Sequence, residues 1–159
     1  MKLLIGAVGK MRGAPEGALV KEYIDRASGM GRGVGVSGVD LFEREAPKSL
    51  SGPALMKREG ELLLAGVPDG AEIVVLDERG ENISSKKLAA YLDTLRLNGV
   101  DAAFLIGGAD GHGAEVRKRA GKTISFGAAT WPHMLVRVML AEQLYRAITI
   151  LTGHPYHRA

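Results

Sequence analysis

Residues 132–158 read PHMLVRVMLAEQLYRAITILTGHPYHR, and the rest of the chain has to pack around the long helix that this stretch predicts. Apolar side chains cover almost its whole circumference, which is typical of a helix buried in a core or shared with a second subunit. Three of the four histidines of the chain lie here. The tail, residues 153–158, is either a solvated terminus or a functional segment, and composition alone leaves both interpretations open.

Upstream of this helix, short apolar runs alternate with amphipathic segments. The predicted strands cover residues 2–8, 34–41, 72–77, 101–106 and 123–126. The predicted helices cover residues 16–27, 54–65, 85–97, 114–120 and the C-terminal stretch, with a loop at 47–53 and a turn and N-cap at 79–85. Strands that alternate with helices predict a single α/β domain, residues 1–159, with a mostly parallel sheet covered by helices on both faces.

Composition excludes several classes of protein. The chain has 159 residues, 46% of them apolar, and no cysteine, so disulfides and thiolate metal sites are excluded. The tail histidines have no acidic cluster beside them, so we expect no metal site. Arg137, Glu142 and Arg146 interrupt the longest apolar run, which argues against a membrane span. The N-terminus lacks the pattern of a signal peptide, and we expect a cytoplasmic protein.

Charge is distributed unevenly along the chain. Residues 1–80 hold 11 Lys and Arg against 12 Asp and Glu, a net charge of −1, whereas residues 81–159 hold 10 against 6, a net charge of +4. A mildly basic second half is compatible with a polyanionic partner such as RNA. The basic residues that we expect to contact phosphates are Lys86, Lys87, Arg117, Lys118 and Arg119.

Three loops follow predicted strands, and a parallel sheet binds ligands beyond the carboxyl ends of its strands. They begin at Leu76-Asp77, at Gly107 and at Phe126. The glycines in the second loop let its backbone approach a ligand closely, although tight turns between packed elements would explain them as well. None of the three loops carries G-x-G-x-x-G, and G-x-x-x-x-G-K-[ST] is absent, which argues against a dinucleotide or a nucleoside triphosphate.

Several motifs, in a fixed order, resemble those of one family. They are Leu76-Asp77, Phe104-Leu-Ile-Gly-Gly-Ala-Asp-Gly111, Ile124-Ser-Phe126, Trp131-Pro-His-Met-Leu-Val-Arg-Val138, Ala141-Glu-Gln-Leu-Tyr-Arg-Ala147 and Gly153-His-Pro-Tyr-His-Arg158. Together they are similar to the bacterial 23S rRNA (pseudouridine-N3) methyltransferase H family of the SPOUT superfamily, over essentially the whole chain. Ala109-Asp110 replaces the commoner Pro-Glu of that family, and Trp131 replaces a smaller apolar residue.

The resemblance implies an α/β knot, in which a parallel-rich sheet is flanked by helices and the C-terminal segment forms a deep trefoil knot. Knots are rare, and no pattern in the sequence predicts one by itself. The resemblance also implies a homodimer with S-adenosylmethionine as cofactor, acting on 23S rRNA in the assembled ribosome. The residues that would line the cofactor are Leu76, Gly107, Phe126, Gly127, Ala128, Ala129, Thr130 and Trp131.

Methylation of N3 of a pseudouridine requires the N3 proton to leave, so a base or a stabiliser of negative charge should lie nearby. The candidates are His133, Tyr156, His157 and Arg158. In the family, the tail of one subunit is thought to complete the site of the other, and which residue takes the proton stays open. The alternative function is a catalytically inactive RNA- or ribosome-binding module of the same fold.

Overall fold

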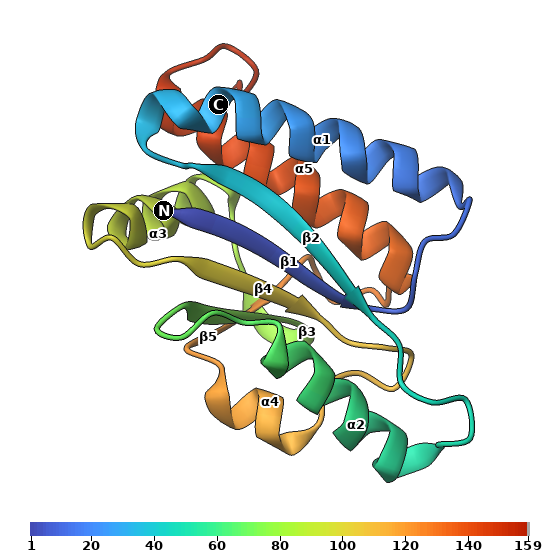
Figure 1. Ribbon diagram of the computed structural model, residues 1–159. Coiled ribbons are helices and arrows are strands. Elements are labelled where there is room, and N and C mark those ends of the chain that lie inside the picture. The colour runs from blue at the N-terminus through green and yellow to red at the C-terminus, as the bar shows by residue number, and fades with distance from the viewer. Residues whose placement is uncertain (159) are drawn as a thin grey trace.

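The computed structural model describes residues 1–158, in which strands and helices alternate along the chain (Figure 1). The strands are β1 (Lys2–Val8), β2 (Gly38–Arg44), β3 (Glu72–Asn82), β4 (Ala102–Ile106) and β5 (Lys122–Ser125). The helices are α1 (Pro15–Gly31), α2 (Gly52–Ala65), α3 (Ser85–Leu97), α4 (Ala114–Arg119) and α5 (His133–Thr152), with a short 3-10 helix, η1 (Arg32–Val34), after α1. The predicted order of elements is confirmed.

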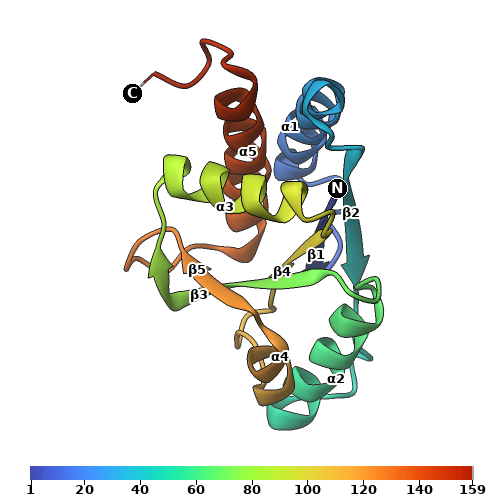
Figure 2. The same cartoon turned by 90° about the vertical axis from the view of Figure 1, so that its left-hand side faces the viewer.

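The strands pair in parallel in one sheet of order β2-β1-β4-β3-β5. Helices α1, α3 and α5 lie on one face of the sheet, and α2 and α4 lie on the other (Figures 1 and 2). The prediction of a parallel sheet covered on both faces is therefore confirmed. All the strands point the same way, so their carboxyl ends gather at one edge.

Two apolar clusters form the core, one on each face of the sheet. In β3, Val74 and Leu76 belong to the larger cluster, under α1, α3 and α5, whereas Ile73 and Val75 belong to the smaller one. Strands β1 and β4 lie inside the sheet and are covered on both faces. This double burial explains why both read as continuous apolar runs in the sequence.

Helix α1 is longer than predicted, because it continues through the glycine-rich stretch to Gly31 and into η1. The predicted strand at 34–41 consequently starts only at Gly38. Glycine costs a helix about 1 kcal/mol relative to alanine. Ala27 is fully buried and Met30 packs against the main core, so tertiary packing offsets this cost.

The predicted turn at 79–85 is wrong in its first half, because β3 continues to Asn82. Its pairing with β5 shifts between Leu76 and Glu81, and both of these residues lie opposite Ile124. The strand therefore bulges outward over residues 77–80. Gly80 is required there, since a Cβ at this position would lie 2.6 Å from the Ile124 backbone. The N-cap is Ser84, whose hydroxyl accepts a 3.2 Å hydrogen bond from the N–H of Lys87.

Helix α5 lies between α1 and α3 and ends at Gly153, whose φ of +70° allows the chain to turn back on itself (Figure 2). None of the helices in residues 1–158 is long and apolar enough to cross a membrane.

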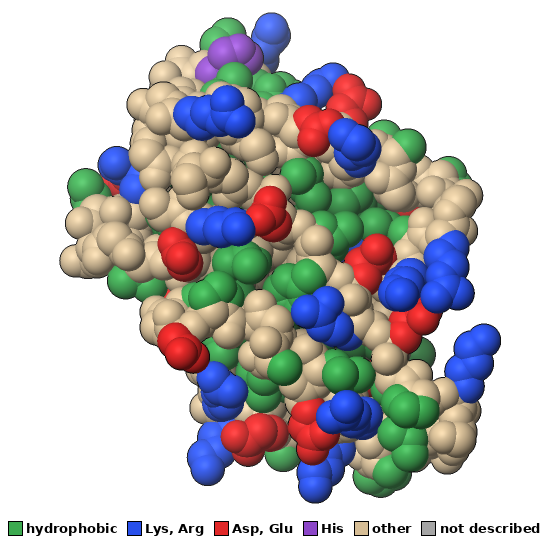
Figure 3. All heavy atoms as spheres, viewed as in Figure 1, with side chains coloured by type: hydrophobic (Ala, Val, Ile, Leu, Met, Phe, Trp, Pro, Cys, Tyr) green, Lys and Arg blue, Asp and Glu red, His purple; other side chains and the backbone are tan. Residues whose placement is uncertain are grey.

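On the face seen in Figure 3, lysine and arginine side chains are interspersed with aspartate and glutamate and do not form one basic patch.

Candidate functional site

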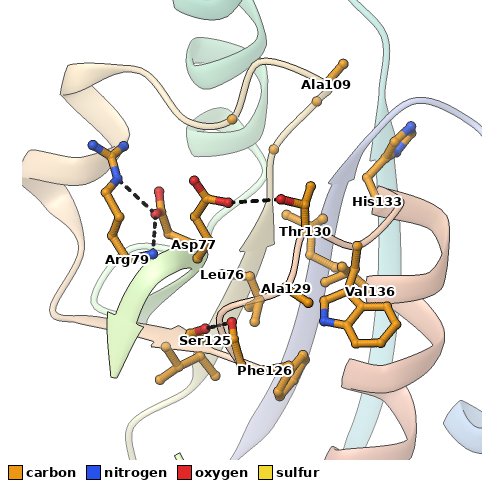
Figure 4. Close-up of a pocket in the computed structure, with 18 of the residues that line it drawn as sticks. Leu76, Asp77, Arg79, Ala109, Ser125, Phe126, Ala129, Thr130, His133 and Val136 are labelled. Carbon is orange, nitrogen blue, oxygen red and sulfur yellow. Dashed lines mark hydrogen bonds and ion pairs between the residues drawn. The ribbon is translucent and has the colours of Figure 1, made fainter. Parts of the chain in front are cut away.

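A cavity of about 290 Å³ opens at the carboxyl ends of β3, β4 and β5, where the three loops meet (Figure 4). Leu76, Ile106, Phe126 and Val136 give it apolar walls, and the glycine loop from Gly107 to Gly111 forms another side. Of the residues expected to line a cofactor, Leu76, Gly107, Phe126, Gly127, Ala129, Thr130 and Trp131 line this cavity, and Ala128 does not.

The bulge in β3 brings polar side chains to the cavity. Asp77, Glu78 and Arg79 all line it, although sequence analysis treated only the first of them as part of the site. They project there because residues 77–80 leave the register of the sheet. In the sequence, the pattern that could have indicated this bulge is Asp77 followed by Gly80 at the end of an apolar strand.

Asp77 is held at the cavity wall by two arginines. Its Oδ1 accepts hydrogen bonds from Arg79 N–H at 2.9 Å and Arg79 Nε at 3.3 Å, and its Oδ2 lies 2.5 Å from Arg117 Nη1. Burial would raise the pKa of Asp77, but the Arg79 N–H and the Arg117 guanidinium outweigh it and hold that pKa below its ordinary value. Arg117 is thus engaged within its own chain, and the exposed Lys87 lies 3.5 Å from Glu81 Oε1. Lys86, Lys118 and Arg119 are exposed.

A buried histidine links the glycine loop to the sheet. Nε2 of His112 lies 3.1 Å from the carbonyl oxygen of Leu105 in β4. The backbone carbonyl of His112 accepts a 3.1 Å hydrogen bond from Arg117 Nε. Burial lowers the pKa of His112. The loop that closes the cavity is therefore anchored to β4 and, through Arg117 and Asp77, to β3.

The loop from Phe126 to Trp131 forms the side of the cavity nearest α5 (Figure 4). Ser125 Oγ donates a 2.7 Å hydrogen bond to the carbonyl of Gly127, and Thr130 Oγ1 donates a 3.4 Å hydrogen bond to Glu78 Oε2. Trp131 is 45% exposed, which is unusual for so large an apolar side chain. Among residues 1–158, no loop or turn hydrogen bond joins the backbone of residues 126–131 to another backbone group, so much of this backbone is available to a ligand.

His133, the first residue of α5, also lines the cavity. Behind it, Arg137 is fully buried and pairs with Glu43 of β2 at 2.8 Å between Nη1 and Oε2. Arg137 Nη2 donates to the carbonyl oxygen of Val8 at the end of β1 and lies 3.4 Å from His133 Nδ1. The motifs in the sequence give no role to Arg137 or to Glu43, because the two residues are 94 positions apart along the chain.

The tail folds back onto the other end of α5. Tyr156 donates a 2.9 Å hydrogen bond from its hydroxyl to Glu142 Oε1, which also accepts from Arg146 Nη2 at 2.6 Å. The Tyr156 ring packs on Tyr145 with centroids 4.6 Å apart. His157 Nδ1 lies 3.5 Å from Arg146 Nη1. Burial, and then the Glu142 hydrogen bond, raise the pKa of Tyr156 to about 12.

Within one chain, the tail and the cavity are far apart. Helix α5 rises about 1.5 Å per residue, so Glu142 and Arg146, which the tail contacts, lie about 14 Å and about 20 Å along its axis from His133. His133 lies at the cavity, whereas Tyr156 and His157 contact Glu142 and Arg146, and the exposed Arg158 does not line the cavity. Residues 1–158 contain no group of three or more His, Asp or Glu that could hold a metal ion.

Comparison with known proteins gives matches over nearly the whole chain. The model of a family described as "Predicted SPOUT methyltransferase" matches residues 1–157. A protein named "Ribosomal RNA large subunit methyltransferase H" from Paramagnetospirillum magneticum is 54% identical over 159 residues, which cover 99% of either chain. Proteins of the same name from Hyphomonas neptunium and Rhodopseudomonas palustris are 51% and 49% identical, each over 160 residues and 100% of both chains.

Solved structures agree in fold. A probable methyltransferase from Bordetella pertussis Tohama I has a TM-score of 0.54 and 12% identity, covering 92% of this chain and 93% of that one. A probable methylase family protein from Haemophilus influenzae Rd KW20 has a TM-score of 0.52 and 11% identity, covering 99% of this chain and 70% of the other. These two likenesses concern the fold alone. The match over residues 1–157 and the full-length relatives at about half identity show that this chain belongs to the SPOUT methyltransferase family.

Proposed function

We propose that this protein is an S-adenosylmethionine-dependent methyltransferase that methylates N3 of a pseudouridine in the 23S rRNA of the assembled ribosome. The observation that carries the proposal is the cavity at the carboxyl ends of β3, β4 and β5, in a chain that matches its family along its whole length. The full-length relatives are named for methylation of large-subunit ribosomal RNA. A ribosomal substrate implies that the protein works in the cytoplasm.

The residues around the cavity fit the proposed cofactor. Its apolar walls suit the faces of a purine, and the free backbone groups of the loop from Phe126 to Trp131 suit the edge of a base. The Glu78 carboxylate has one hydrogen bond among residues 1–158, the 3.4 Å bond from Thr130, and so keeps acceptor capacity for ribose hydroxyls or an ammonium group. The bound cofactor would supply a methyl group already activated by its sulfonium.

The protein then has to orient the base, exclude water and manage one proton. Methylation replaces the N3–H bond by an N3–C bond, and the N3 proton leaves. His133 is the candidate residue at the cavity itself, whereas the tail contacts α5 at Glu142 and Arg146, about 14 Å and about 20 Å along the helix axis from His133. None of Tyr156, His157 and Arg158 lines the cavity of its own chain, and we propose that the tail contributes to catalysis at the cavity of a second subunit.

A homodimer would bring such a second cavity within reach. Leu135 and Trp131 are 40% and 45% exposed, and Val138 and Met139 continue the same apolar face of α5. Exposed apolar side chains that cluster in this way mark an interaction surface. We propose that this face pairs two copies of the chain. The trefoil knot of the C-terminal segment stays a prediction.

The decisive experiment incubates the purified protein with radiolabelled S-adenosylmethionine and with ribosomes that lack the modification. We expect label in 23S rRNA, and none with ribosomes that already carry the methyl group. Calorimetry should show binding of S-adenosylmethionine and not of NAD. If the protein binds the cofactor and remains folded but transfers no label, the inactive RNA-binding module replaces the methyltransferase.

A further inference from the structure

The ring of His133 lies between the cavity and a buried positive charge. Its Nδ1 lies 3.4 Å from Nη2 of Arg137, one turn further along α5. Nε2, the other ring nitrogen, has no hydrogen-bond partner within residues 1–158 and is not enclosed by protein atoms. His133 lines the cavity, and it presents Nδ1 to Arg137 and leaves Nε2 open to the cavity and solvent.

Arg137 is fixed in place by partners on two strands. Nη1 pairs with Glu43 Oε2 at 2.8 Å, and Nη2 donates to the carbonyl oxygen of Val8. Glu43 is itself anchored, because its Oε2 also accepts a 2.8 Å hydrogen bond from the N–H of Met11. Arg137 has no exposed surface, and only its Nε lacks a partner among the described residues. The guanidinium thus has one position relative to the His133 ring.

A guanidinium has donors only and keeps its proton in proteins. Where it approaches a ring nitrogen, that nitrogen has to be the one without hydrogen. Nδ1 of His133 is consequently the acceptor, and in the neutral ring the hydrogen sits on Nε2. Burial, and then the Arg137 charge, lower the pKa of His133, which favours the same neutral form.

We infer that Arg137 is a positioning residue that fixes His133 as the neutral tautomer with hydrogen on Nε2, so that His133 serves the substrate as a hydrogen-bond donor and not as the base that removes the N3 proton. This role rests on the proposed function. A donor at this place stabilises the negative charge that the pyrimidine oxygens take up as N3 loses its proton. The N3 proton itself passes to a water molecule.

The tautomer can be measured without any catalysis, by long-range proton–nitrogen correlation NMR on the full-length protein at neutral pH. We expect Nδ1 of His133 to give the signal of an unprotonated nitrogen and Nε2 that of a protonated one. In Arg137→Met this preference should be lost, whereas Arg146→Met, which removes the other arginine close to a histidine, should leave the His133 signals unchanged.

Hydrogen on Nδ1 of His133 in the wild-type protein, or a positively charged ring at neutral pH, would overturn the inference. The spectrum of the wild-type protein decides this even where Arg137→Met does not fold. Glu43→Gln is the milder variant: it keeps the guanidinium and should keep the tautomer. A Glu43→Gln protein with hydrogen on Nδ1 would also contradict the inference, because Arg137 would then not control the ring.

Catalysis gives an independent test through two amide replacements. The amide nitrogen of Gln reaches the position of Nε2, and that of Asn the position of Nδ1. We expect His133→Gln to transfer methyl groups within about 10-fold of the wild type, and His133→Asn to fall about 10²-fold or more, as far as His133→Ala. Equal loss in His133→Gln and His133→Asn would refute the donor role. If the wild type transfers no methyl at all, the proposed function fails, while the NMR result still decides the tautomer.

Discussion

The two ends of α5 carry similar sets of side chains in different surroundings. At the first end, Arg137 lies between Glu43 and His133. At the second end, Arg146 lies between Glu142 and His157. In each set an arginine pairs with a glutamate and approaches Nδ1 of a histidine, at 3.4 Å in the first and 3.5 Å in the second. Only the first set borders the cavity.

The two sets differ in how buried the arginine is and in which elements it joins. The Arg137 side chain is 0% exposed and bonds to the ends of β1 and β2, so this set belongs to the core. The Arg146 side chain is 26% exposed, and its glutamate lies one turn earlier on the same helix. The first arrangement fixes a histidine at the cavity. The second holds the tail by partly exposed contacts.

The largest expected effect comes from deleting residues 156–159. We expect methyl transfer to fall at least about 10³-fold, the range for loss of general acid–base and positioning groups, because the proposed active site loses its tail residues. The thermal unfolding midpoint should change little, since among residues 156–158 the Tyr156 ring alone packs against an apolar cluster. Turnover at the wild-type rate would show that the tail is an ordinary terminus.

Mixing variants tests whether the tail acts on a second subunit. The truncated chain and a His133→Ala chain should each transfer methyl groups at least about 10²-fold more slowly than the wild type as homodimers. When they are unfolded and refolded together, heterodimers hold one cavity with an intact His133 and an intact tail. Methyl transfer should then reappear. Its absence, with heterodimers demonstrated by mass spectrometry, would place the tail outside the neighbouring site.

The next effect compares the two arginines directly. Arg137→Met breaks a buried ion pair and leaves the Val8 carbonyl without its partner, and we expect it to cost about 3–5 kcal/mol of unfolding free energy. Arg146→Met removes a partly exposed pair on one helix and should cost less than about 1 kcal/mol. Urea unfolding measures both. Equal costs would mean that the two ends of α5 do not differ in the way described.

The first end of α5 also shows where sequence reasoning stops. Apolar runs and helical periodicity predicted the order of strands and helices, and strand ends predicted the loops around the cavity. The Arg137–Glu43 pair joins residues far apart in the chain, and nothing local in either segment indicates it. The bulge of β3 was missed for a related reason. Arg79 and Gly80 read as a turn, and only the pairing with β5 keeps them within a strand.

The smallest expected effect concerns Tyr156 at the second end of α5. Its raised pKa contributes stability that is fully present below the ordinary tyrosine pKa near 10 and is lost as pH rises through about 12. Burial is the main cause and the Glu142 hydrogen bond comes next, so Glu142→Gln should lower this pKa while leaving it above the ordinary value. NMR titration of isotope-labelled tyrosine measures it, with Glu61→Gln as a surface control.

Two outcomes for the Tyr156 pKa in Glu142→Gln would change this description of the second end of α5. A Tyr156 pKa that is unaffected by Glu142→Gln would mean that the hydroxyl does not bond to Glu142 in solution. A fall to the ordinary value would mean that the ring has left its place against Tyr145, and that Glu142 alone holds the tail on its own helix. An intermediate value supports a tail held mainly by packing. A tail held in this way could leave its own helix and pack against a partner subunit without leaving a buried charge unpaired.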